Sequence, residues 1–259
     1  MKLNKVPALT GIEWVKLGIR TFFRQPLALA GLFFMFMLLV TLLSVVPVLG
    51  HFISLALLPA ATLGLMAATR EASSGKFPMP TILATAFQAG KSQVRAMVIL
   101  GGLYAVGSAG VMLLAGAISG ADVQTLSAEA TSPETLMMHP DMVSNMFITM
   151  VLYLPLGLLF WHAPALVHWH GVTPGKSLFF SALACWTNKL ALIVFFFAWT
   201  AVFMGFAMAV VMLALLLGGP AALAVITFPV VMLLTSMFFT SLYFTFRDSF
   251  VTDDGQAPA

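Results

Sequence analysis

Long runs of apolar residues without Asp, Glu, Lys or Arg recur along the 259-residue chain. A helix needs about 20 such residues to cross the hydrocarbon core of a bilayer. Six runs meet or approach this length, and short connections between several of them predict antiparallel hairpins. We expect an all-α polytopic membrane protein with six transmembrane helices arranged as three hairpins in a single membrane domain, 1–259. The predicted spans are about 27–46, 52–69, 96–118, 146–167, 190–217 and 221–246, followed by a tail, 247–259.

Shorter amphipathic stretches precede each predicted hairpin. In residues 10–25 apolar side chains recur at helical spacing, and Trp14 suits the membrane interface. Shorter patterns of the same kind start at Pro80 and at Thr173. We expect two or three interfacial helices on the cytoplasmic side, in an order that predicts a threefold internal repeat. The apolar positions of the first stretch are Ile12, Val15, Ile19, Phe22 and Phe23.

The charged residues predict the orientation. All 12 Lys and Arg residues fall on one side of the six-span arrangement, whereas the long opposite loop, 119–145, carries only acidic charges. Because Lys and Arg accumulate in cytoplasmic loops, both termini are expected in the cytoplasm of a bacterial inner membrane. With 61% hydrophobic and only 8% charged residues, the composition excludes a soluble globular protein. The net charge of +3 therefore reflects topology and gives no support to nucleic-acid binding.

Small residues recur at every fourth position in three of the predicted spans. Such stripes let the backbones of neighbouring helices approach closely in lipid. They predict packing within the bundle, with homodimerisation through one stripe as the less favoured use. The stripes are Ala56, Ala60, Gly64 and Ala68; Gly101, Ala105 and Ala109; and Ala201, Gly205 and Ala209.

The chain carries few residues suited to catalysis. No carboxylate, Lys or Arg lies within a predicted span, which argues against proton-coupled transport and charge-ring channels. Nucleotide-binding, nucleophile-elbow and metalloprotease motifs are absent, and the single cysteine, Cys185, suits a buried apolar position. We expect a non-enzymatic protein without cofactor or metal that interacts with membrane lipids. A homo-oligomer or an envelope-protein partner stays open. The alternatives are a transporter or channel for a neutral or amphiphilic solute and, more remotely, an intramembrane enzyme.

A polar cluster at the end of the fourth span supplies the candidate site residues. Pro164 lacks a backbone N–H and opposes the carbonyl four residues earlier, so we expect it to break the span there. The helix that starts at Thr173 would then fold back beneath the break, and Ser181, Asn188 and His162 would supply hydrogen bonds. The alternative is that the proline merely ends the span. A metal site is not favoured, because the nearby histidines lack a complete ligand set.

Residues 162–183 followed by Asn188, together with the opening segment 11–26, resemble an uncharacterised family of six-span bacterial inner-membrane proteins. That family is similar to the membrane domain of some glycerophosphodiester phosphodiesterases. The resemblance implies the architecture and the bacterial inner-membrane location. It assigns no catalytic residue, and the soluble phosphodiesterase domain has no counterpart here.

Overall fold

The structure, a computed structural model, describes residues 2–47, 49–120 and 139–251. Six helical spans in this part of the chain are long and apolar enough to cross a membrane. The expected all-α polytopic membrane fold is therefore confirmed. The spanning helices are α2 (Pro26–Ser44), α3 (Leu49–Ser73), α5 (Lys91–Ser119), α8 (Pro140–Phe160) continued by α9 (Ala163–His170), α11 (Lys189–Leu217) and α12 (Pro220–Ser249).

Shorter elements precede the hairpins and join the two ends of the chain. The expected stretch at Pro80 forms only a 3-10 turn and one α turn, so it is too short to lie along the membrane as a helix of its own. Proline in the first turn begins several helices, because its fixed φ suits that position. The short elements are α1 (Thr10–Arg24), η1 (Pro80–Ala84), α4 (Thr85–Gln88), α10 (Pro174–Thr187), and an antiparallel ribbon of β1 (Lys2–Leu3) with β2 (Phe250–Val251).

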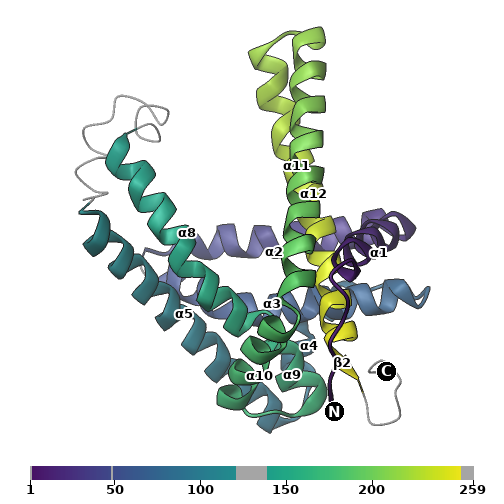
Figure 1. Cartoon of the computed structure of the whole chain (residues 1–259), viewed down its shortest axis with the longest axis vertical. Helices are drawn as coiled ribbons and strands as arrows, with labels where there is room; N and C mark the ends of the chain where they lie inside the picture. The colour runs from purple at the N-terminus through teal and green to yellow at the C-terminus, as the bar shows by residue number, and fades with distance from the viewer. Residues whose placement is uncertain (1, 48, 121–138, 252–259) are drawn as a thin grey trace.

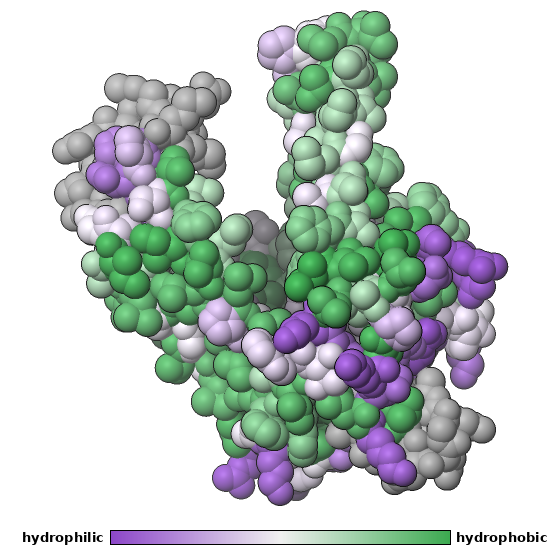
Figure 2. Space-filling model, in the orientation of Figure 1, coloured by the Kyte–Doolittle hydropathy of each residue, from purple (hydrophilic) through white to green (hydrophobic). Residues whose placement is uncertain are grey.

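Two of the hairpins diverge from one end of the molecule, and the α2–α3 hairpin crosses behind them (Figure 1). We call this end the base; it holds the β1–β2 ribbon, α9 and α10. The α5–α8 and α11–α12 pairs rise from the base as two separate arms, and α2 passes behind them. In the space-filling view the arms are predominantly hydrophobic and enclose a hollow (Figure 2). Such surfaces suit contact with lipid rather than water.

The helix α1 packs against the protein on a face that overlaps the expected one: Val15 and Phe22 are buried, as are Trp14 and Gly18. Trp14 is fully buried, and its indole Nε1 donates to Asp248 Oδ2 at 2.9 Å, so this side chain packs inside the protein; the interfacial position of the helix stays a prediction. Phe23, from the expected apolar face, is 64% exposed. Instead α1 crosses α12 at Gly18, where a Cβ would lie 2.5 Å from Ser241 Cβ. At Gly11 an added Cβ would collide with the carbonyl oxygen of Ala191 in α11. The face of α1 that carries Gly11 and Gly18 therefore packs against α11 and α12.

The small-residue stripes have different uses. A Cβ on Gly101 would collide with the carbonyl oxygen of Ala56, so α3 and α5 cross at this point. Gly64 packs against η1, where an added Cβ would lie 2.8 Å from Leu83 Cα. The stripe around Gly205 in α11 is exposed and packs against no helix in the described part of the chain. The expectation of bundle packing holds for the first two stripes and is wrong for the third.

All 12 Lys and Arg residues lie in elements or helix ends that converge on the base. They occur in β1, α1 and the segment between them, around the end of α3, in the first turns of α5 and α11, in α10, and near the end of α12. Asp141 begins α8 at the opposite end. Three further loop acids, Asp122, Glu129 and Glu134, lie outside the described residues. An even number of spans places both chain ends on one side of the membrane; which side that is stays a prediction.

Candidate functional site

The fourth span is interrupted, and one serine forms hydrogen bonds with the two backbone groups that the interruption leaves unpaired. The span expected at 146–167 divides at Trp161–His162, and Pro164 lies in the first turn of α9 rather than at the break. In a continuous helix the His162 N–H would donate to the Leu158 carbonyl. Here the His162 N–H donates to Ser181 Oγ at 2.9 Å, and the same hydroxyl donates to the Leu158 carbonyl at 2.8 Å. Ser181 of α10 therefore takes the place of one backbone hydrogen bond. Backbone groups freed by a break within a membrane need such partners from the protein.

The side chains of the other two expected partners, His162 and Asn188, make no hydrogen bond at the break within the described residues. His162 is 1% exposed, its ring faces Phe246 and Phe250, and its Nδ1 has no hydrogen-bond partner among the described residues. Asn188 is 2% exposed and binds no group at the break. The expectation that Asn188 supplies hydrogen bonds to the break is therefore wrong.

Asn188 instead joins the two ends of the chain. Its Oδ1 accepts from the Val6 N–H at 2.9 Å, and its Nδ2 donates to the Asn4 carbonyl at 2.9 Å and to Ser249 Oγ at 3.2 Å. A turn between α10 and α11 places the amide in this position, because Asn188 is the last residue before α11. Its role in the structure is to hold the N-terminal segment against the end of α12.

An apolar groove of about 320 Å³ lies beside the break, where α3, α5, α8, α9 and α12 converge. Pro164 is the one candidate residue that lines it. Its polar side chains are largely engaged: the Thr62 hydroxyl donates to the Leu58 carbonyl, and the Trp161 indole N–H donates to Thr245 Oγ1. The lining residues are Leu58, Pro59, Thr62, Tyr104, Gly157, Phe160, Trp161, Pro164, Phe238, Phe239 and Leu242.

The groove exists because small and rigid residues leave room beside aromatic ones. A Cβ on Gly157 would meet no atom within 4 Å, so this glycine leaves open space on the wall formed by α8. On the opposite wall Pro59 lies inside α3. The Tyr104 and Phe160 rings pack edge to face with centroids 5.0 Å apart, which fixes the aromatic wall between α5 and α8.

Toward the base the groove ends at a packed layer. Leu63 and Met66 of α3 and Leu166 and Val167 of α9 are at most 1% exposed and close the space between the helices. We call these four residues the waist. Thr62 and Pro164 line the groove, whereas Ala67 and His168 line a second pocket at the base, so the waist lies between the two spaces along α3 and α9.

The cysteine beside the break is not an activated thiol. The thiol of Cys185 lies 3.7 Å from the Leu158 carbonyl oxygen, and burial raises its pKa to about 12 against a smaller opposing effect of Ser181. A thiol with so high a pKa stays protonated and unreactive near neutral pH. Within the described residues no three His, Cys, Asp or Glu side chains come together as metal ligands would.

Sequence reasoning identified the break but missed the groove. The helices that wall it extend from α3 to α12, and other elements lie between α3 and α5 and between α9 and α12, so spacing in the sequence does not reveal their convergence. Two local signals were available, namely Pro59 within a span and Gly157 in an otherwise bulky stretch of α8. Neither signal says which helix lies opposite.

A probable inner membrane protein of Burkholderia thailandensis is 36% identical to this chain over 263 aligned positions, covering 100% of this chain and 97% of the relative. No protein-family model matches the chain, and no solved structure matches it. The aligned region takes in all six apolar spans, so the similarity extends over the whole membrane domain rather than one segment. The chain belongs to the same family as this Burkholderia protein and is a multi-pass inner membrane protein.

Proposed function

We propose that the protein is a non-enzymatic lipid-binding protein of the inner membrane, which holds one acyl chain of a bilayer lipid in the groove beside the α8–α9 break. The observation that carries the proposal is the groove itself, an apolar cavity among the spans whose wall opens at Gly157. We expect both termini in the cytoplasm, because all 12 Lys and Arg residues fall on one side of the six-span arrangement. The similarity to the membrane domains of glycerophosphodiester phosphodiesterases stays a prediction, and no activity is taken from it.

The depth of the groove favours a hydrocarbon occupant. Pro59 precedes Arg70, at the base end of α3, by eleven residues, which corresponds to roughly 16 Å along a helix. A bilayer's hydrocarbon core is about 30 Å thick, so the groove lies within it. An apolar cavity whose polar side chains are mostly engaged attracts hydrocarbon rather than water.

The waist favours a binding role over transport. A carrier or channel needs a path along the bundle, whereas α3 is buried on all sides from Leu63 to Thr69. The Asn188 amide, which would have suited a polar pathway, is used entirely inside the protein. Transport of a neutral or amphiphilic solute is therefore the weaker proposal.

A glycine substitution tests the proposal without disturbing a packed contact. Gly157→Leu places a side chain in the groove, and Gly205→Leu is the matched control because its added atoms also meet no neighbour and face outward. The number of phospholipids retained by the detergent-purified protein is counted by native mass spectrometry. We expect the parent and Gly205→Leu to retain one lipid that Gly157→Leu loses. Equal retention by all three proteins would refute the groove as a lipid site.

A further inference from the structure

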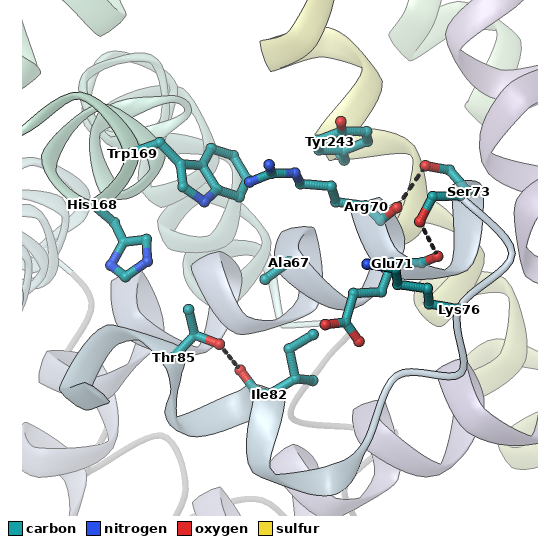
Figure 3. A pocket seen from close by; sticks show the side chains of 11 residues that line it. Ala67, Arg70, Glu71, Ser73, Lys76, Ile82, Thr85, His168, Trp169 and Tyr243 are labelled. Atoms are coloured by element: carbon teal, nitrogen blue, oxygen red, sulfur yellow. Dashed lines mark hydrogen bonds between the residues drawn. The ribbon is translucent and has the colours of Figure 1, made fainter. Parts of the chain in front are cut away.

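A second, polar pocket of about 600 Å³ lies at the base, beyond the waist (Figure 3). It is formed by the last turns of α3, the turn that follows them, η1, α4, α9 and α12. It therefore lies at the level where the spans emerge from the hydrocarbon core. The lining residues are Ala67, Arg70, Glu71, Ser73, Ser74, Lys76, Ile82, Thr85, His168, Trp169 and Tyr243.

Arg70 lines this pocket, and its guanidinium stacks on an aromatic ring but forms no ion pair with any described residue. Its Cζ lies 5.6 Å from the centre of the Trp169 ring, and the two side chains extend alongside each other in Figure 3. Trp169 is itself held by Tyr243 and Phe246, with ring centroids 6.1 and 5.2 Å away. In the described part of the chain no carboxylate forms an ion pair with Arg70. Stacking orients the guanidinium and leaves its N–H groups available.

Lys76 adds a second cation to the pocket. It lies on the turn after α3, which is held by residues of the α1 end. Gly75 has φ of +83°, a left-handed conformation that suits glycine and ends α3. Arg24 donates to the Ser73 carbonyl at 3.1 Å, and the Gln25 side chain donates to the Lys76 carbonyl at 3.0 Å. The backbone of the turn is thereby tied to the end of α1, while the Lys76 ammonium has no partner among the described residues.

Glu71 is the one acidic residue of the pocket, and it does not neutralise Arg70. Its carboxylate points toward Ile82, whereas the Arg70 guanidinium points toward Trp169 (Figure 3). No ion pair joins Glu71 to Arg70 or Lys76 in the described residues. Among the described residues the pocket therefore combines two cations that form no ion pair with one carboxylate that points away from the Arg70 guanidinium.

We propose that this pocket binds a phosphate group, with Arg70 and Lys76 as its ligands. The planar guanidinium matches two phosphate oxygens, and a lysine adds a mobile point charge. The phosphate can belong to a phospholipid headgroup at the membrane surface or to a soluble phosphate ester, since both present the same oxygens. The waist separates this site from the groove, so the proposal does not depend on the acyl-chain site.

Two forms of the ligand test the site and separate the sources of the phosphate. Binding of glycerol 3-phosphate to the detergent-purified protein is measured by isothermal titration calorimetry. Binding of phosphatidic acid, with diacylglycerol as its phosphate-free control, is measured by native mass spectrometry. We expect Arg70→Gln and Lys76→Gln to weaken phosphate binding, the former by about tenfold or more. Glu71→Gln should strengthen it, because a negative charge near the phosphate is removed.

Arg95→Gln is the matched control, since Arg95 is an exposed arginine in the first turns of α5 and does not line the pocket. Lys76→Gln keeps the test valid if Arg70→Gln fails to fold, because the exposed ammonium makes no contact needed for folding. Binding in either arm that depends on Arg70 or Lys76 supports the site and identifies the source as soluble or lipid. Phosphate binding that is absent, or unchanged in Arg70→Gln and Lys76→Gln, would overturn it.

Discussion

The Ser181 hydroxyl occupies the place that one backbone hydrogen bond would hold in an unbroken helix. Because it both accepts from the His162 N–H and donates to the Leu158 carbonyl, it leaves neither group unpaired in the buried break. Asn188 has a comparable role at the base, where its side-chain amide forms hydrogen bonds with two backbone groups of the N-terminal segment. In both cases a polar side chain fixes the path of the backbone in surroundings that offer little water.

Ser181→Ala should destabilise the protein by roughly 1–3 kcal/mol, because two buried backbone groups lose their partner. Ser177→Ala is the control on the same helix, since the Ser177 hydroxyl bonds only to the Pro174 carbonyl of its own first turn. Thermal unfolding in detergent measures the difference. Equal melting temperatures for the two variants would show that the break does not need the serine.

Asn188→Ala should release the N-terminal segment from the end of α12. The Val6 N–H and the Asn4 carbonyl lose their buried partner, so hydrogen exchange of residues 2–6 and of β2 should accelerate. Gln88→Ala removes an exposed amide with one long bond of 3.4 Å and serves as the control. Unchanged exchange in Asn188→Ala would contradict the assigned role.

Helix crossings in this fold occur where one partner has no Cβ. Gly11 and Gly18 bring α1 onto α11 and α12, and Gly101 brings α5 onto α3. These contacts explain why the buried face of α1 is centred on Gly11, Trp14 and Gly18 and includes only part of the expected apolar face. Close approach at Gly11 and Gly18 buries Trp14 between them, whereas Phe23 lies beyond the crossing and stays exposed.

Gly64→Leu should destabilise the bundle, because even the Cβ would lie 2.8 Å from Leu83 Cα, a backbone atom that cannot move aside cheaply. Gly205→Leu, on the exposed stripe of α11, should leave the melting temperature nearly unchanged. Thermal stability in detergent again provides the measurement. A larger loss in Gly205→Leu than in Gly64→Leu would reverse this assignment of the two stripes.

The sequence predicted the helices well and their mutual contacts poorly, for a physical reason. Length and apolarity determine whether a segment can span a bilayer, and both are local properties. Which stripe meets a partner is decided by distant segments, so the stripe at Gly64 and the stripe at Gly205 look alike in the sequence. For the same reason the sequence indicated a break near Pro164 and named Ser181 among its partners, whereas the aromatic wall of the groove could not be predicted from it.

The molecule as a whole has a narrow packed base and arms that diverge from it (Figure 1). All its Lys and Arg residues gather at the base, which is the side expected in the cytoplasm. The groove lies among the spans and the phosphate pocket at the base, with the waist between them. Under our two proposals, a lipid chain and a phosphate group would be bound at separate levels of one bundle.

Cysteines at Ser74 and at Ala130 should react with an impermeant maleimide from opposite sides of the membrane, with Ala130→Cys labelled from the periplasm. Ser74 is exposed at the base, and Ala130 lies outside the described residues. The native Cys185 should contribute little background, because burial raises its pKa to about 12 and keeps it protonated at the pH of labelling. Labelling of both positions from the same side would contradict the six-span topology.

The acyl-chain site is tested most directly by an experimental structure of the protein in lipid nanodiscs, determined by electron cryomicroscopy. The account predicts elongated density in the groove, running between Gly157 of α8 and Pro59 of α3 and continuous with the surrounding bilayer. The same map of Gly157→Leu should lack this density while the helices stay in place. A groove closed by Phe238 and Phe239, or one holding only isolated peaks of water, would contradict the account.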